Sequence, residues 1–203
     1  MNCLILAGGP SLPGILQGRK CRQAGWFTIG VNLAGYMIGD WVDICFFADS
    51  LMWWNHKDAL MKCRARKISL DKIKPGVESI KGKAPDVEIW KWGGCHGINT
   101  GPGMCCFNRS SGGAAINMAY HLGARRILLA GYDMHSDYQG RDRNWYPEQY
   151  QRKSRKGYGN MLLSFDRIAH DARRLKIEII NVTPGSAITQ FPFASMEDFG
   201  CLS

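Results

Sequence analysis

Residues 109–133 constrain the fold more than any other stretch, because they read as a loop, a helix and a short buried strand in immediate succession. Ser110 and Ser111 offer hydroxyls that can cap a helix, and apolar residues then recur at helical spacing until Gly123. Residues 127–131 follow as a short apolar run, which is typical of a parallel strand that is buried on both faces. The unit therefore predicts an α/β protein with a parallel sheet.

The same unit predicts a binding site for an anion. Gly112 and Gly113 leave the backbone open at the helix start, and free N–H groups at a helix N-terminus attract negative charge. Tyr132 and Asp133 follow the strand at its carboxyl end, where ligands of open α/β sheets lie. The alternative is an ordinary helix and strand whose glycines serve only close packing.

Three further apolar runs each end in small or polar residues. Because the carboxyl ends of parallel strands meet at one edge of a sheet, we expect these residues to converge on one cleft and to contact a base or a ribose. The alternative for each polar residue is an ordinary cap. The runs and the residues that follow them are 3–7 with Gly8, Gly9, Pro10 and Ser11; 27–31 with Asn32; and 43–48 with Asp49 and Ser50.

The turn at residues 8–11 is a candidate phosphate loop between a strand and a helix. It lacks the Gly-Lys-Ser/Thr ending of a Walker A loop and the G-x-G-x-x-G spacing of a dinucleotide-binding turn. The sequence therefore disfavours an ATP-binding or NAD-binding site.

The middle of the chain adds shorter elements. Residues 51–56 are expected to begin a helix that packs against the sheet, and residues 67–70 read as a strand. Residues 87–92 alternate as a half-exposed edge strand does, and the polar residues 72–86 before them read as a loop. The glycine-rich residues 93–103 are expected to form a mobile loop that covers the ligand.

Residues 134–160 are expected to form a basic and aromatic lid segment. Aromatic side chains alternate there with Arg and Lys, which suits a lid over a nucleotide or a stacking surface for bases. A poorly ordered basic loop is the alternative. Residues 161–175 then predict an amphipathic helix, and residues 176–182 predict the last major strand.

The net charge favours an anionic partner. With 26 Lys and Arg against 17 Asp and Glu, the formal charge is +9, which suits nucleotides, nucleic acid or acidic glycans without choosing among them. The cations cluster at residues 64–67 and 141–156, and this clustering favours a basic rim. A solvated basic face is the alternative.

Cysteine usage and hydropathy indicate a cytoplasmic protein. The eight cysteines include no C-x-x-C pair, so neither a zinc site nor a disulfide framework is expected, and we interpret them as reduced thiols. The N-terminus has no basic segment ahead of a long apolar one, and no run approaches the roughly 20 apolar residues that span a bilayer. We expect a soluble, intracellular protein.

Six short motifs follow one another along the chain: GGPS at 8–11, VN at 31–32, ADS at 48–50, SSGGAA at 110–115, LLAGYDM at 128–134 and NVTPGSA at 181–187. Their order and spacing resemble those of the bacterial sialyltransferases of glycosyltransferase family 42 and of the related DUF115 proteins. That group includes archaeal 6-hydroxymethylpterin diphosphokinase-like enzymes and short phage-encoded members. The resemblance covers most of the chain but leaves residues 62–92 unmatched.

The resemblance implies a Rossmann-like α/β fold, in which a mostly parallel sheet carries helices on both faces, as a single domain of residues 1–203. In the sialyltransferases it also implies a CMP-sugar donor and no required metal or other cofactor. The nucleotide contacts of the family fall on Gly8, Gly9, Pro10 and Ser11, on Asn32, on Ser111, Gly112 and Gly113, and on the strand end at Gly131, Tyr132 and Asp133.

The catalytic base of the family is missing from its usual place. The sialyltransferases use a His in the segment before the last long helix, whereas this chain has Asn-Trp-Tyr-Pro at 144–147 and no His between His135 and His170. By position and residue type, Asp133, His135 and Tyr146 are the candidates for a general base or a stabiliser of the leaving phosphate.

Four functions therefore stay open. The first is a glycosyltransferase-like transferase with a nucleotide-activated donor of the CMP-sugar type. The second is a pterin-type diphosphokinase, which would need Mg²⁺ on Asp133 and Asp137. The third is a non-catalytic nucleotide-binding or sequestering protein, and the fourth is a modifier or binder of nucleic acid such as phage DNA, in the host cytoplasm. The sequence leaves open whether the chain forms a homo-oligomer.

Overall fold

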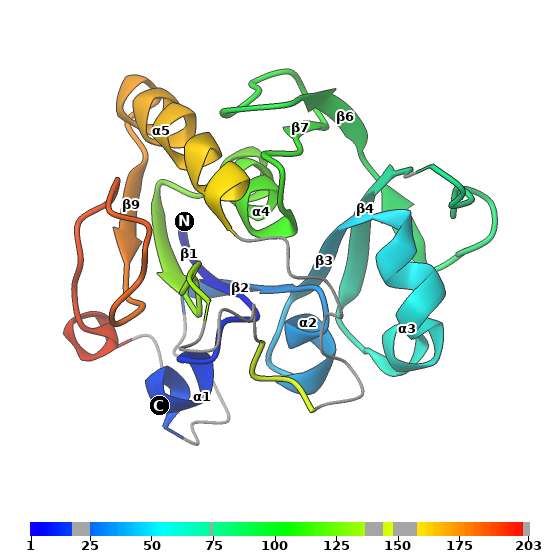
Figure 1. The fold of residues 1–203 in the computed structure, drawn as a ribbon, viewed down its shortest axis with the longest axis horizontal. Coiled ribbons are helices and arrows are strands. Elements are labelled where there is room, and N and C mark those ends of the chain that lie inside the picture. The colour runs from blue at the N-terminus through cyan, green and yellow to red at the C-terminus, as the bar shows by residue number, and fades with distance from the viewer. Residues whose placement is uncertain (18–24, 74, 137–143, 148–157, 201–203) are drawn as a thin grey trace.

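The computed structural model describes residues 1–17, 25–73, 75–136, 144–147 and 158–200. Its centre is a seven-stranded sheet with the strand order β5-β4-β3-β2-β1-β8-β9, and every strand pairing in this sheet is parallel (Figure 1). The strands are β1 (Asn2–Leu6), β2 (Trp26–Val31), β3 (Ile44–Asp49), β4 (Arg66–Lys72), β5 (Val87–Ile89), β8 (Arg126–Ala130) and β9 (Glu178–Asn181).

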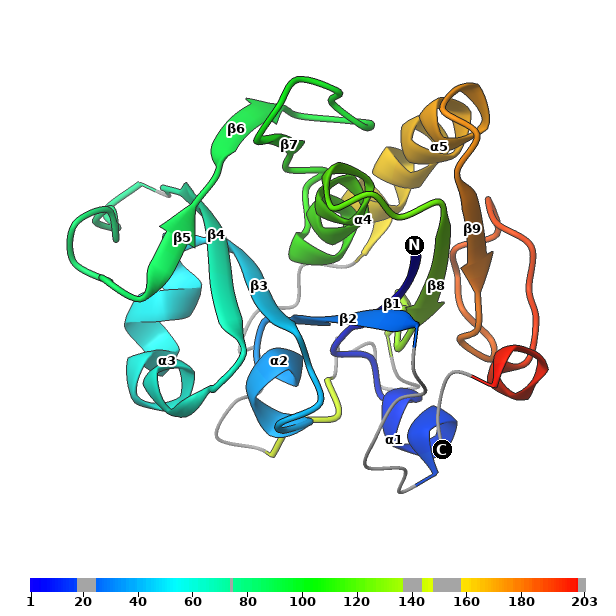
Figure 2. The ribbon, with the colours of Figure 1, turned by 180° about the vertical axis from the view of Figure 1, so that it is seen from behind.

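Helices cover both faces of the sheet, as Figures 1 and 2 show from opposite sides. One face carries α1 (Leu12–Leu16), α2 (Ala34–Met37) and α3 (Ser50–Lys62), and the other carries α4 (Ser111–His121) and α5 (Gly159–Arg174). A short 3₁₀ helix, η2 (Met196–Phe199), lies near the end of the chain. The prediction of a Rossmann-like, mostly parallel α/β domain is confirmed.

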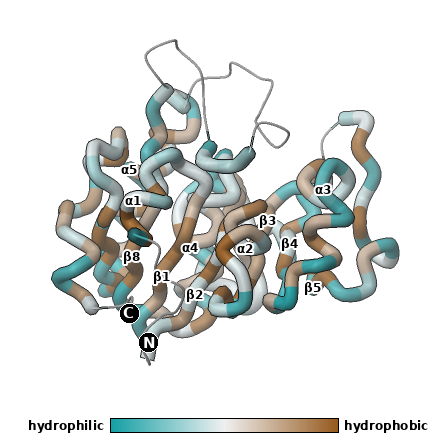
Figure 3. Tube along the Cα trace, turned by 90° about the horizontal axis from the view of Figure 1, so that it is seen from below, coloured by the Kyte–Doolittle hydropathy of each residue, from teal (hydrophilic) through white to brown (hydrophobic). Residues whose placement is uncertain are grey.

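The central strands are buried on both faces, which explains why their sequences show no alternation. In β1, Cys3, Leu4, Ile5 and Leu6 are all 0% exposed. Cys3 and Ile5 pack into the core under α4 and α5, whereas Leu4 and Leu6 pack into the core that includes α1. Each such side chain contributes about 1.5–3 kcal/mol on burial, and Figure 3 shows the hydrophobic segments gathered in the central strands.

The strand order places a topological switch point between β1 and β8. From β1 the chain moves outward through β2, β3, β4 and β5, and it then returns to the other side of β1 as β8. The connection that leaves β1 passes through α1 on one face, whereas α4 on the opposite face precedes β8. At such a point the two loops diverge and leave a crevice outside the carboxyl ends of the strands.

The stretch at residues 87–92, which the sequence predicts as one edge strand, is divided. β5 does form the edge of the main sheet, and Trp90 still donates its N–H to the Ser69 carbonyl at 2.9 Å. The chain then leaves the sheet as β6 (Lys91–Gly94), which pairs in parallel with β7 (Met104–Cys106) in a separate two-stranded sheet.

Buried side chains anchor the glycine-rich segment 93–103 beside α4 and α5. The N–H of Gly97 donates to Asn108 Oδ1 at 2.7 Å, and that of Asn99 donates to Asn117 Oδ1, on α4, at 2.9 Å. The N–H of Ile98 donates to Asp171 Oδ2, on α5, at 3.0 Å. None of residues 93–103 lines the cleft presented below, so a mobile loop that covers the ligand stays a prediction.

The sequence analysis expected reduced cysteine thiols and no segment that spans a membrane. Burial raises the pKa of Cys105 to about 12, so this thiol stays protonated. No helix in the described ranges has the length and apolar character that crossing a membrane requires. Of the cysteines that the structure describes, Cys95 is exposed, and Cys3, Cys45, Cys63, Cys105 and Cys106 are buried, as expected of small hydrophobic side chains.

Asp171, which accepts the Ile98 N–H, is the charged residue among the side chains that hold segment 93–103 in place. Burial alone raises the pKa of its carboxyl group, but the Ile98 N–H, His170, Arg167 and Arg174 outweigh burial, and the net pKa lies below the usual value. Because the folded-state pKa is lower than the unfolded one, the stability gained from this carboxylate is present above the unfolded pKa of about 3.9 and is lost as the pH falls through the folded value.

We expect Asp171→Asn to reduce the acid sensitivity of the fold. The amide keeps an oxygen for the Ile98 N–H but has no proton to take up, so stability should change less between about pH 5 and pH 2 than in the unchanged protein. Guanidinium unfolding at a series of pH values measures this difference. Asp58→Asn serves as a control, because it removes an exposed carboxylate on α3 that takes no part in these contacts. Identical acid profiles for Asp171→Asn and the unchanged protein would contradict the prediction.

Candidate functional site

A cleft lies at the switch point, outside the carboxyl ends of β1, β2 and β8. The cleft has a volume of about 80 Å³ and opens to solvent. The N-terminal ends of α4 and α5 close its sides. Its lining comprises Ala7, Gly8, Gly9, Val31, Asn32, Ser110, Ser111, Gly112, Gly131, Tyr132, Met134, Asn144, Tyr158, Met161 and Phe165.

The glycine turn after β1 forms the floor of this switch-point cleft. The N–H of Gly9 donates to the Gly131 carbonyl at 2.8 Å, so the turns after β1 and β8 touch. A Cβ atom on Gly9 would lie 1.8 Å from Asp133 Oδ2 and 2.4 Å from that carbonyl. Gly131 has φ +72°, which favours glycine. Both glycines are therefore required by the close approach of two turns.

Asp133 holds this turn in place. Its Oδ1 accepts the Ser11 N–H at 3.1 Å, and its Oδ2 accepts the Ser11 hydroxyl at 2.9 Å. The residue is 4% exposed and does not line the cleft. Both carboxylate oxygens bond to Ser11, which disfavours the predicted role of Asp133 as a general base or a stabiliser of the leaving phosphate. Ser11 and Pro10, predicted as nucleotide contacts, are also absent from the lining.

We expect Gly9→Ala to lower the free energy of unfolding by about 2–3 kcal/mol, because the added methyl group overlaps Asp133 and the Gly131 carbonyl. Gly14→Ala is the matched control, since a Cβ atom at Gly14 meets nothing within 4 Å. The control should stay within about 1 kcal/mol of the unchanged protein. Guanidinium unfolding measures both, and equal stability of the two variants would contradict the packing argument.

Two substitutions of Asp133 separate a structural role from a catalytic one. Asp133→Asn keeps groups that can bond the Ser11 N–H and hydroxyl, so we expect a loss of less than about 1 kcal/mol of stability. Asp133→Ala leaves both Ser11 donors unpaired and should cost about 2–3 kcal/mol. Thermal and guanidinium unfolding test this order. Full stability of Asp133→Ala would show that the carboxylate does not hold the turn.

The N-terminus of α4 points its first N–H groups into the cleft. Ser110 caps the helix by accepting the Gly113 N–H at 3.0 Å. Ser111 accepts the Ala48 N–H at 3.1 Å, which fixes the helix start to the end of β3. The N–H groups of Ser111 and Gly112 belong to the first turn and have no intrahelical acceptor. Together with the helix dipole they favour an anion at this end.

Tyr132 and Gly112 form the wall between α4 and β8. The Tyr132 hydroxyl donates to the Gly112 carbonyl at 3.0 Å, and burial raises its pKa well above the usual value, so the phenol stays neutral. Gly113, also predicted to contact the nucleotide, does not line the cleft. A Cβ atom there would lie 2.6 Å from the Asn108 Cβ, so this glycine serves close packing.

Asn32 follows β2 and lines the cleft as predicted. Its φ of +56° is left-handed, a conformation that Asn tolerates better than most residues. Its N–H donates to the Phe46 carbonyl at 2.8 Å, which fixes the backbone. Among the described residues the Asn32 side chain has no hydrogen-bond partner, so its carboxamide is free to bind a ligand.

Asp49 and Ser50 act as helix-capping and packing residues, not as cleft residues. Asp49 accepts the Met52 N–H at 3.2 Å and caps α3, and the buried Ser50 donates its hydroxyl to the Lys72 carbonyl at 3.3 Å. β3 lies two strands away from β1 in the sheet, and the Ala48 N–H near its end bonds to Ser111, whereas Asp49 and Ser50 lead into α3. Neither residue lines the cleft, so a contact of these two residues with a nucleotide stays a prediction that the geometry does not favour.

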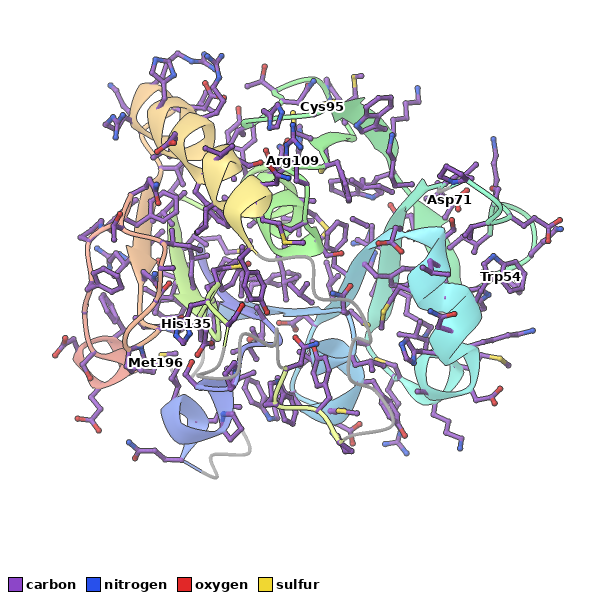
Figure 4. All side chains as sticks on the ribbon, viewed as in Figure 1. Trp54, Asp71, Cys95, Arg109, His135 and Met196 are labelled. Carbon is purple, nitrogen blue, oxygen red and sulfur yellow. The ribbon has the colours of Figure 1, made fainter. Side chains whose placement is uncertain are left out.

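The other two candidate catalytic residues lie outside the cleft lining. His135 is exposed, and its Nδ1 lies 3.3 Å from the Ser136 carbonyl (Figure 4). Tyr146 is 6% exposed, and its hydroxyl donates to the Val31 carbonyl at 3.4 Å. The N–H of Trp145 donates to the Gly8 carbonyl at 3.0 Å, so residues 144–147 lie over the glycine turn. This contact brings Asn144 into the lining.

Several lining residues were missed by the sequence analysis. Ser110 was recognised only as a cap, and Met161 and Phe165 lie in the range that was predicted only as an amphipathic helix. The N-terminal end of α5 reaches the cleft because the chain enters this helix directly beside the start of α4, and the two helices are in contact. Ser110 and Phe165 could have been identified by a pattern: each is a polar or aromatic residue near the start of a helix that precedes a strand. The lining residues that the sequence analysis did not assign to a ligand are Ser110, Met161 and Phe165, whereas Met134, Asn144 and Tyr158 belong to the predicted lid segment at 134–160.

The basic run at residues 64–67 does not form a rim around the cleft. Arg64 pairs with Asp40 at 3.3 Å, Arg66 pairs with Glu88, and the buried Lys67 pairs with Asp86 at 3.1 Å. The run leads into the amino-terminal end of β4, opposite the cleft edge. Its charges are largely neutralised by acids, which corrects the expectation for this cluster. Residues 137–143 and 148–157 of the predicted lid, and most of the second basic cluster, lie outside the described residues.

The described lining contains no Asp, Glu, His, Lys or Arg side chain. Among the described residues, no group of three or more His, Cys, Asp and Glu side chains could hold a metal ion. Of the carboxylate pair that the diphosphokinase alternative needs, Asp133 is bound to Ser11 and Asp137 lies outside the described residues. Backbone N–H groups, carboxamides and hydroxyls are thus the polar groups that the described cleft offers.

Solved structures of a sialyltransferase share this fold. CstII from Campylobacter jejuni, in complex with the substrate analogue CMP-3FNeuAc, has a TM-score of 0.52 and 14% identity over 96% of this chain and 86% of that chain. The CST-II variant with Ala in place of an Asn, in complex with CMP, has a TM-score of 0.51 and 13% identity over 95% and 86%. The sequence matches no family model and no curated protein. At this identity the likeness establishes the fold.

Proposed function

We propose that the chain is a glycosyltransferase-like protein that binds a nucleotide-activated donor of the CMP-sugar type in the switch-point cleft. One observation carries the proposal: the glycine turn, the α4 N-terminus and the unpartnered Asn32 carboxamide meet in one cleft. The fold shared with CMP-bound sialyltransferases supports the same donor class.

The donor phosphate would lie between the two glycine-containing segments. The N–H groups of Ser111 and Gly112 face the cleft with the positive end of the helix dipole behind them. Across the cleft the Gly8 N–H has no hydrogen-bond partner among the described residues. Such uncharged donors can hold a phosphate and also stabilise the negative charge that develops on it when the sugar leaves.

The Asn32 side chain would recognise the nucleoside by hydrogen bonding. It stands at the end of β2, the strand next to β1, one strand spacing away from the phosphate position. Its carboxamide offers an acceptor oxygen and two donor hydrogens, which can pair with a ribose hydroxyl or with the polar edge of a pyrimidine. Because the cleft opens to solvent, the rest of the donor would extend outward from the phosphate region.

A second candidate function is nucleotide binding without transfer. The described lining has no side chain that could serve as a general base, since Tyr132 is neutral and bonded and Asp133 holds the turn. That observation favours a binding protein, whereas a base contributed by residues outside the described ranges would favour a transferase. Release of the free sugar or its transfer from CMP-N-acetylneuraminate, followed by chromatography, separates the two functions.

We expect CMP to bind without added metal and Asn32→Gly to weaken its binding by about tenfold or more, since one to two hydrogen bonds are lost. Glycine at position 32 preserves the left-handed backbone, so the effect reports the carboxamide alone. Asn55→Ala, an exposed position on α3, is the control and should bind as the unchanged protein does. Isothermal titration measures all three.

No heat of binding with CMP, UMP, GMP or AMP, with or without Mg²⁺, would reject the proposed donor site. The basic and aromatic segment 134–160 should then be tested against DNA and RNA. Tight CMP binding that Asn32→Gly leaves unchanged would instead place the nucleotide elsewhere on the protein.

A further inference from the structure

A second concave surface lies at the opposite end of α4 from the cleft. This aromatic groove, with a volume of about 710 Å³, is lined by the C-terminal turn of α4, by residues 88–91 and by the loop at 100–103. α4 has 11 residues and is therefore about 16 Å long, with its first turn in the cleft and its last turn in the groove. The groove is thus a separate site on the same helix.

Three half-buried rings form the wall of the aromatic groove. Trp90 and His121 meet edge to face, with centroids 6.0 Å apart and planes at 78°, and Tyr120 and His121 meet at 5.3 Å and 65°. Rings that cross at these angles leave no parallel slot for a planar base. They offer single ring faces and edges, which suit the C–H faces of a saccharide ring.

The polar groups of the groove include donors that lack a partner acid. The Arg125 guanidinium lies 5.5 Å over the Tyr120 ring and donates one N–H to the Ala124 carbonyl, which leaves its other donors available. Lys91 and Thr100 are exposed, and their side chains have no hydrogen-bond partner among the described residues. The one carboxylate of the described lining, Glu88, already accepts from Arg66 and from the Trp90 indole. The groove therefore carries uncompensated positive charge.

His121 adds an acceptor. Its Nε2 bonds to the Met104 carbonyl at 2.7 Å, so this nitrogen carries the proton. In the neutral ring the second nitrogen, Nδ1, is then an acceptor with no partner among the described residues. Ring faces, cationic donors and a neutral acceptor in one open groove match the alternating C–H, hydroxyl and carboxylate groups of an acidic sugar chain.

We propose that the aromatic groove binds an oligosaccharide that carries carboxylate groups, with a sugar ring against Trp90 and Tyr120 and a carboxylate at Arg125 and Lys91. The inference goes beyond the proposed function, because it concerns a second site and stands whether or not the cleft binds a nucleotide. On a protein that also transfers a sugar, such a groove would retain a polymeric acceptor near the cleft.

The test uses a hexasaccharide of alternating glucuronate and N-acetylglucosamine, and its carboxyl-reduced form as the neutral counterpart. We expect the acidic hexasaccharide to quench tryptophan fluorescence and to bind at least about tenfold more tightly than the neutral one. Arg125→Ala and Lys91→Ala should each weaken binding about fivefold or more. Arg126→Ala is the matched control, because this neighbouring arginine pairs with Glu178 and lies outside the groove.

Several results would overturn the proposal. They are the absence of binding, equal binding of the neutral hexasaccharide, or equal weakening by Arg126→Ala and Arg125→Ala, which would indicate a general charge effect. Competition by CMP would place the sugar in the switch-point cleft and not in the groove. Because Arg125 and Lys91 are exposed, their removal leaves the core intact, and circular dichroism verifies that the variants fold.

Discussion

The contact between the turns after β1 and β8 is the constraint on which the rest of the structure depends. The Gly9 N–H donates to the Gly131 carbonyl, and both carboxylate oxygens of Asp133 accept hydrogen bonds from Ser11. The two turns join elements that are 122 residues apart and draw together the two strands at which the topology reverses. A crevice at this point is general to open α/β sheets, but its floor is shaped here by two glycines and one carboxylate.

The other side of the cleft is fixed by α4, and α4 is fixed by buried amides. Asn108, which is 0% exposed, donates to the carbonyls of Gly97 and Gly113, and Asn117 accepts the N–H groups of Asn99 and Cys106. These hydrogen bonds satisfy backbone groups of Gly97, Asn99 and Cys106. They also hold the start of α4 in a fixed position over the sheet. The orphan N–H groups of the helix are thereby presented to the cleft in a fixed position.

The fold could be predicted from the sequence because buried strands and helix starts each produce a recognisable local pattern of residues. Short apolar runs that end in polar residues gave the strands, and the small residues at 110–113 gave the helix start. The sequence did not indicate which strands are neighbours: Asp49 and Ser50 follow an apolar run as Asn32 does, yet they do not line the cleft, and β3 lies two positions from β1. It also did not indicate the partner of the Asp133 carboxylate, because Ser11 is distant in sequence.

The net charge of the protein is not carried by side chains of the described cleft lining. The sequence carries a net charge of +9, but the basic run at 64–67 is paired with acids at the other end of the sheet, and the described cleft lining has no charged side chain. Anion selection in the described cleft therefore depends on uncharged donors and on the helix N-termini that border it, which act over a few ångströms and demand close fit. Cationic side chains elsewhere can raise the local concentration of an anionic ligand over longer distances. A cleft built in this way discriminates by shape and hydrogen bonding, because an anion that does not reach both the glycine turn and the α4 N-terminus gains little from either.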